Sequence, residues 1–354
     1  MRAQQQAGFP GGNERTLIAR SVASFFPASA TYIIPRSGWY RLSALGAGGS
    51  GGAIFQTTAG GASTGGGGGQ YAESEVYLKA GTVVTITIGA GGLSVSSNVS
   101  GTGVSGSDGG DTLISCPGVS IRAHGGKGGR FSIINAAVVP GGLAGTGPTG
   151  AEFTADGAPS GTATHTTNAA NASGGGAPGT PGGPGGPSGN CYGTLASASG
   201  GGGLHGYPSG AAFGATLSAS GDGGPNGASA DANGTTTAPG MRALGVTGVC
   251  ADGLTRSGAF AGFESMTDPF SLLTGPCSSA GIAHNYNTGQ TIFSGSVLLG
   301  ASGGITCGPA SNTYDYANSG SVTFGGGSGA AASSISYAVS ARGGNGLVVI
   351  ERIG

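Results

Sequence analysis

Apolar and polar residues alternate with a period of two in three stretches of the chain, which is the pattern of β-strands with one buried face. Residues 38–45 read GWYRLSAL, and every second residue from Tyr40 is apolar. Residues 71–78 and 83–88 alternate in the same way, and Gly81 between them accepts the positive φ of a turn. The pattern predicts three strands, with the second and third joined as a β-hairpin.

Two further stretches are typical of strands. Residues 111–126 form a predicted second hairpin that turns at Pro117–Gly118, because proline and glycine suit the two central positions of a tight turn. The chain closes on GLVVIERIG, a β-rich run that we expect to pair with an earlier strand. The fold class predicted is therefore mainly β with almost no α-helix.

A period of three replaces the period of two at residues 174–189, which read GGGAPGTPGGPGGPSG. Neither an α-helix nor a strand has this period, whereas the polyproline-II helix does. That helix leaves its backbone N–H and C=O groups unpaired, so glycine-lined copies packed side by side could bond to one another. The alternative is a disordered glycine-rich linker. The predicted scaffold residues of this polyglycine-II bundle are Gly176, Gly179, Gly182, Gly185, Pro178, Pro181 and Pro184.

The composition favours a fold in which backbone hydrogen bonds supply an unusually large share of the stability. Glycine supplies 82 of 354 residues, only 8% of residues are charged, and the formal net charge is −1. A near-neutral chain has no basic patch for nucleic acid, and no apolar run is long enough to insert into a membrane. Because large side chains are scarce, oligomerisation is a plausible second source of stability.

Motifs for catalysis and cofactors are weak. Residues 46–51 fit G-x-G-x-x-G, but the glycine-rich sequence that follows cannot form the helix that a dinucleotide site needs. Isolated histidines and turn-forming aspartates predict no catalytic set, no cofactor and no metal, so we expect no enzymatic activity. The cysteines are widely spaced and their pairing is left open: Cys116, Cys191, Cys250, Cys277 and Cys307.

The order of several motifs resembles the glycine-rich domain of bacteriophage tail-fibre and receptor-recognition (adhesin) proteins. These are GWYRLSALGAGG from Gly38, the strand pair that ends in ITIGAGG, GDT, GGKGG and the closing GGNGLVVI. The resemblance covers residues 38–129 and 341–353. It implies strands that flank a polyglycine-II bundle on a virion surface, in a protein made in the bacterial cytoplasm.

The same resemblance indicates a function and a set of partners. We expect a virion adhesin that meets a host surface glycan or outer-membrane protein, assembled as a homo-oligomer, a trimer being one option. A capsid, collar or neck protein with a purely structural role is the alternative, and a glycan depolymerase is a weaker third.

Two regions carry the expected contacts. Residues 1–30 form a predicted attachment arm to other virion proteins, and residues 31–354 form the glycine-rich domain with a loop-rich insertion at about 130–340. Tyrosines beside asparagine in loops are common binding anchors, although aromatic residues more often fill a core. The candidate receptor-binding residues are Asn285, Tyr286, Asn287, Asn312, Tyr314 and Tyr316.

Overall fold

The protein is mainly β, as the alternating patterns predict. The computed structural model describes residues 23–57, 60–134, 137–165, 170–193, 197–202, 301–302, 322–333 and 337–354, together with short strands between residues 212 and 318. These parts consist of strands, turns and extended segments, and they contain no α-helix. The strands form several small sheets.

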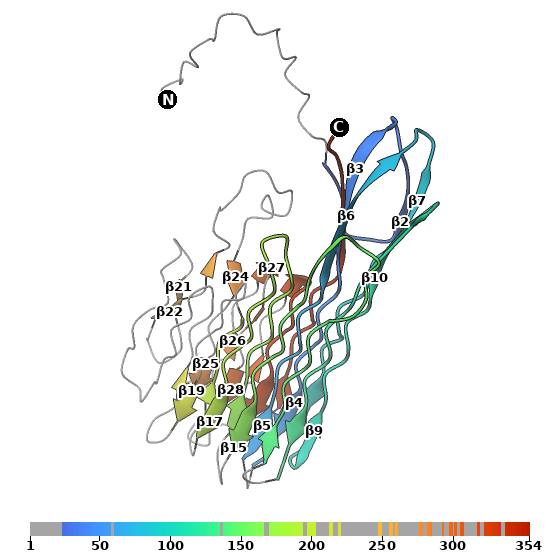
Figure 1. Cartoon of the computed structure of the whole chain (residues 1–354). Helices are drawn as coiled ribbons and strands as arrows, with labels where there is room; N and C mark the ends of the chain where they lie inside the picture. Colours follow the sequence, from blue (N-terminus) through green and yellow to red (C-terminus); the bar gives the residue numbers. More distant parts are fainter. Residues whose placement is uncertain are drawn as a thin grey trace, which may run out of the picture.

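Two of the sheets face each other and form a β-sandwich at one end of the molecule (Figure 1). Their facing surfaces enclose the main hydrophobic core, which includes Tyr40, Leu42, Ile86, Ile114 and Ile350. Sheet A has the order β1 (Ala23–Phe26), β33 (Leu347–Arg352), β3 (Gly38–Leu45), β6 (Tyr71–Leu78), β14 (Phe153–Ala155). Sheet B has the order β11 (Val119–Ala123), β10 (Thr112–Cys116), β7 (Val83–Thr87), β2 (Ala30–Ile33).

The predicted hairpin of residues 71–88 is wrong in its pairing, although both strands exist. β6 pairs with β3 and β14, whereas β7 pairs with β2 and β10 in the other sheet. The link between them crosses the open end of the sandwich, where Gly81 has a φ of 82° and its N–H donates to Ile34 O at 2.8 Å. Alternation predicts which face of a strand is buried, but each of these strands can bury that face in either sheet.

The other two strand predictions are confirmed. β10 and β11 form an antiparallel hairpin around Pro117–Gly118, and Gly118 has a φ of 78°. The closing strand β33 lies between β1 and β3 and pairs with both in antiparallel register. Residues 23–30 belong to the predicted arm, yet they include β1 and the first residue of β2.

At the opposite end lie rows of two- and three-residue strands, many of them paired in parallel (Figure 1). Residues 130–202 contribute to these rows as well as to sheet A. Two rows join segments from the first two thirds of the chain: β12 (Phe131–Ser132), β5 (Gly61–Ser63), β16 (Ala170–Ala172), β18 (Ser197–Ala198), β20 (Ala219–Ser220); and β13 (Val138–Val139), β15 (Ala163–His165), β17 (Cys191–Gly193), β19 (Ala212–Gly214).

The remaining short strands come mostly from the later part of the chain. Two rows also take in early strands: β25 (Ile282–His284), β28 (Ile305–Cys307), β31 (Ala331–Ser333), β4 (Ala53–Phe55), β9 (Thr102–Val104); and β26 (Ile292–Phe293), β29 (Ala317–Asn318), β32 (Ala338–Val339), β8 (Ser96–Ser97). Three pairs complete the set: β21 (Thr247–Val249) with β22 (Thr255–Ser257), β23 (Ala259–Phe260) with β24 (Pro276–Ser278), and β27 (Val297–Leu299) with β30 (Val322–Phe324).

Candidate functional site

Extended segments that are not strands join the two ends of the molecule, and we call each of them a leg and the set of them the glycine bundle. The chain runs from β3 through one leg to β4, turns, and returns from β5 through the next leg to β6 (Figure 1). The described legs are residues 46–52, 64–70, 89–95, 105–111, 124–130, 140–150, 156–162, 173–179, 184–190, 199–202, 325–330 and 340–346.

The leg at residues 64–70 lies at the centre of the bundle, since its backbone N–H groups donate to several other legs. The acceptor leg changes from one residue to the next and recurs three residues later. Gly66 and Gly69, for example, both donate to leg 325–330. The donor–acceptor pairs are Gly66 N to Ser328 O (2.9 Å), Gly67 N to Lys127 O (2.8 Å), Gly68 N to Ala158 O (2.9 Å), Gly69 N to Gly325 O (2.8 Å) and Gln70 N to His124 O (2.8 Å).

The carbonyl groups of this leg follow the same three-residue repeat. They accept bonds from Gly52 N at Thr64 O (3.0 Å), Gly142 N at Gly65 O (3.1 Å), Gly176 N at Gly66 O (2.9 Å), Gly49 N at Gly67 O (2.9 Å), Gly145 N at Gly68 O (2.8 Å), Gly179 N at Gly69 O (3.0 Å) and Gly46 N at Gln70 O (2.8 Å). Buried backbone groups must be paired, and here the neighbouring legs supply the partners that a sheet or helix would otherwise provide.

Close approach of the legs leaves no room for side chains at the glycines of the central leg. A Cβ atom added to Gly66, Gly67 or Gly68 would meet the carbonyl oxygen of Gly49, Leu143 or Ala177 respectively, at distances that real Cβ atoms essentially never show. Three successive residues thus contact three different legs. The run of five glycines at 65–69 is a sequence signal for this crowded position, but it lacks the three-residue spacing that indicates a leg at 174–189.

The predicted scaffold residues at 174–189 take part in the bundle, with one difference from the expected continuous helix. Gly176 and Gly179 donate to leg 64–70, and Gly185 N donates to Asp156 O at 3.0 Å. Between them the chain reverses, because Thr180 and Gly183 exchange backbone bonds of 2.9 and 3.0 Å. Pro181 and Gly182 occupy the centre of this turn, where such a pair is favoured. Pro178 is buried, whereas Pro184 is exposed.

The candidate receptor-binding residues lie outside the described residues, and so do residues 1–22 of the predicted arm. The structure neither brings Asn285, Tyr286 and Asn287 together with the other candidates nor separates them.

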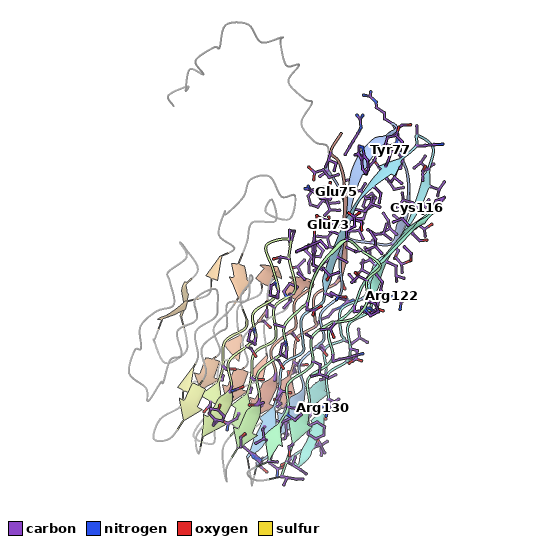
Figure 2. The ribbon with its side chains drawn as sticks, viewed as in Figure 1. Glu73, Glu75, Tyr77, Cys116, Arg122 and Arg130 are labelled. Atoms are coloured by element: carbon purple, nitrogen blue, oxygen red, sulfur yellow. The ribbon has the colours of Figure 1, made fainter. Side chains whose placement is uncertain are left out.

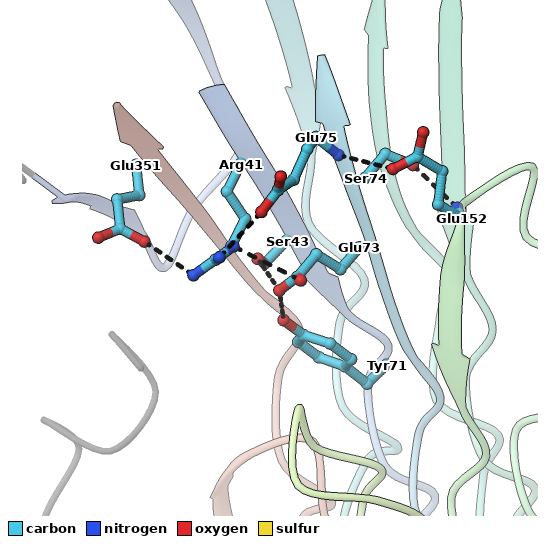
Figure 3. A network of polar contacts seen from close by, with 8 residues as sticks. All are labelled: Arg41, Ser43, Tyr71, Glu73, Ser74, Glu75, Glu152 and Glu351. Atoms are coloured by element: carbon cyan, nitrogen blue, oxygen red, sulfur yellow. Dashed lines mark hydrogen bonds and ion pairs between the residues drawn. The ribbon is translucent and has the colours of Figure 1, made fainter. Parts of the chain in front are cut away.

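A polar network on the outer face of sheet A was not predicted (Figure 3). The Arg41 guanidinium contacts Glu75 at 2.9 Å, Glu351 at 3.4 Å and Glu73 at 3.5 Å, which links β3, β6 and β33. Tyr71 donates its hydroxyl to Glu73. Burial acts to lower the pKa of Arg41, but the bond to Glu75 and the charges of the three carboxylates raise it above its ordinary value. The network therefore holds a permanent cation that ties three strands together.

Glu73, Glu75 and Tyr77 lie on the sandwich, whereas Arg130 lies toward the opposite end (Figure 2). Within the described residues no three metal-ligating side chains cluster. No helix among them is long and apolar enough to cross a membrane.

Three buried or partly buried side chains in the described parts could in principle react: the thiols of Cys116 and Cys191 and the imidazole of His165. Cys116 and Cys191 are free thiols, and burial raises the pKa of Cys191 to about 12. His165 is fully buried at the end of β15, and neither ring nitrogen has a hydrogen-bond partner. Burial lowers the pKa of His165, which therefore stays neutral at pH 7. None of these groups adjoins a second catalytic side chain in the described contacts.

The sandwich and the backbone-bonded bundle define a class of glycine-rich β-protein. A family model described as a glycine-rich domain matches residues 25–262, which is more than half of the chain, so the chain belongs to the glycine-rich domain family. No curated protein matches the sequence.

Proposed function

We propose that the chain is a bacteriophage virion protein, a tail-fibre or adhesin component, that holds host-binding loops on a rigid bundle of polyglycine-II helices. The observation that carries this proposal is the leg at residues 64–70, whose backbone bonds to six surrounding legs. The match to the glycine-rich domain family supports the glycine-rich scaffold, and the resemblance in the order of motifs from Gly38 onward is the reason for proposing a virion role.

The polyglycine-II conformation is the part of the proposal that accounts for the three-residue repeat of bonding partners. A helix with three residues per turn points every third residue in the same direction, so residues such as Gly66 and Gly69 reach the same neighbour. A strand would alternate its bonds between two neighbours in one plane. Six partners around one leg fit a three-fold helix in a bundle better than a strand in a sheet.

The position of the chain ends supports display of the opposite end. β1 begins at Ala23 and β33 ends at Arg352, and the two strands are paired in sheet A. An attachment arm at residues 1–22 would connect to the sandwich, leaving the turns at the far end of the bundle free. Loops fixed to a bonded bundle lose little conformational entropy on binding, which favours affinity.

The test uses the labelled full-length protein on the bacteria that the producing phage infects. We expect saturable binding that blocks infection, and loss of both when the tyrosines at 286, 314 and 316 are replaced by serine while the melting temperature is unchanged. A protein that does not bind these cells, and that images place in many copies around the head or neck, would instead be a cladding protein. In that case the bundle would serve the particle as a structural element.

A further inference from the structure

The outer face of sheet A carries large aromatic side chains that are exposed in the described parts of the structure. Trp39 and Tyr77 are a cross-strand pair in edge-to-face contact, with ring centroids 6.0 Å apart. Their exposed fractions are 52% and 55%, and Phe25 and Phe153 on the flanking strands are 38% and 42% exposed. Aromatic residues of this kind are enriched at the centres of protein interfaces.

Acidic groups lie on one side of the aromatic pair along the strands. Glu75 is opposite Arg41, two residues along the strands from the Trp39–Tyr77 pair and on the same face, and Glu73 is opposite Ser43, two residues further along. With Glu351, these carboxylates surround the single guanidinium of Arg41. Glu152 adds an exposed carboxylate at the edge of the sheet, where it accepts a bond from Glu75 N at 3.1 Å. The formal charge of this group is −3.

Basic groups lie on the other side of the aromatic pair, at the open end of the sandwich. Arg36 and Lys79 are exposed there. Arg352 is opposite Tyr40 in the register of sheet A, on the core-facing side, but its guanidinium reaches the same end, 3.5 Å from Ser37 O. The formal charge of the three is +3. Residues 27–40 and 76–92, which build this end, include no acidic residue. Their loops are held by backbone bonds, for example Ile34 N to Thr82 O at 2.9 Å and Trp39 N to Gly354 O at 3.0 Å.

We propose that this face binds a second copy of the chain in a two-fold symmetric dimer. A two-fold axis lying in the interface, across the strands at Trp39 and Tyr77, reverses the order of the groups. The basic end of one copy then lies over the acidic group of the other, and the aromatic pairs meet between them. A two-fold interface must be self-complementary, and equal and opposite charges on either side of an apolar centre have that property.

The proposal does not depend on the virion function, since it concerns the purified chain alone. Sedimentation equilibrium of the full-length protein at micromolar concentration should give twice the 33.2 kDa chain mass. Trp39→Ser should raise the dissociation constant at least tenfold. The matched control is Leu143→Ser, because Leu143 is 63% exposed on the glycine bundle, away from sheet A, and should leave the constant unchanged.

Charge reversal gives the sharper test. Lys79→Glu and Glu152→Lys should each weaken the dimer severalfold, whereas an equimolar mixture should form a heterodimer with near wild-type affinity. Melting temperatures equal to that of Leu143→Ser would show that the variants fold. A wild-type monomer at 50 μM would overturn the proposal. So would a dimer dissociation constant that Trp39→Ser leaves unchanged, or a mixture of the two charge variants that does not recover the wild-type affinity.

Discussion

Replacing Gly67 with alanine adds one methyl group at the centre of the glycine bundle. Gly67 N donates to Lys127 O at 2.8 Å, and Gly67 O accepts from Gly49 N at 2.9 Å. The new Cβ would overlap the carbonyl group of Leu143, which is backbone and cannot rotate away. The legs must therefore separate, and both hydrogen bonds lengthen.

The expected cost follows from these contacts. Overpacking costs about 1–3 kcal/mol, and weakening two buried backbone bonds adds about 0.5–1.5 kcal/mol each. Lower entropy of the unfolded chain returns about 0.4–1 kcal/mol. The net loss of unfolding free energy is about 3 kcal/mol, which corresponds to a melting temperature lowered by roughly 4 °C for a chain of this length.

The measurement is urea and thermal unfolding followed by circular dichroism, with Gly110→Ala as the control. Gly110 also lies in a leg, but its added Cβ would come no closer than 3.2 Å to another atom, Ala90 N. We expect this variant to stay within about 1 kcal/mol of the wild type, since the neighbour need move only slightly. Equal stability of the two variants would refute close backbone packing at the central leg.

Three other predictions concern the core and the buried reactive groups. Ile86→Ala, between the two sheets, should lower the unfolding free energy by about 2–5 kcal/mol, whereas exposed Thr85→Ala should change it by less than about 0.5 kcal/mol; similar losses in urea unfolding would contradict the sandwich. Because burial lowers the pKa of His165, the unfolded chain binds the proton more readily, so the free energy of unfolding should decline as the pH falls below about 6.5. The unfolding free energy of His165→Gln should decline less steeply, and parallel curves for the two proteins would count against this role of His165. Cys191, with a pKa of about 12, should resist iodoacetamide at pH 8 in the folded protein and react after unfolding; mass spectrometry that finds rapid native modification would show that the thiol is accessible.

The sequence predicts the strands better than their partners. Alternation identifies β3, β6 and β7 and the buried face of each, yet the sheet that each strand joins depends on contacts between distant residues. The Arg41 network illustrates this limit, because its members are brought together only by the order of strands in sheet A. No local pattern indicates such a set.

The spacing of the glycines likewise predicts only part of the glycine bundle. The period of three at 174–189 predicts backbone-bonded legs, and Gly176 and Gly179 take part in such bonds. It does not predict the reversal at Thr180–Gly183, because proline and glycine favour both an extended helix and a tight turn. The central role of residues 64–70 depends on their six neighbours, which come from all along the chain.

Hydrogen exchange of the backbone amides most directly tests whether the bundle is a bonded scaffold. The amides of legs 64–70 and 173–179 should exchange as slowly as those of β3, because the backbone bonds described for these legs join segments that separate only when the bundle opens. Exchange of these glycine amides at the rate of an unstructured peptide, while β3 remains protected, would contradict the account.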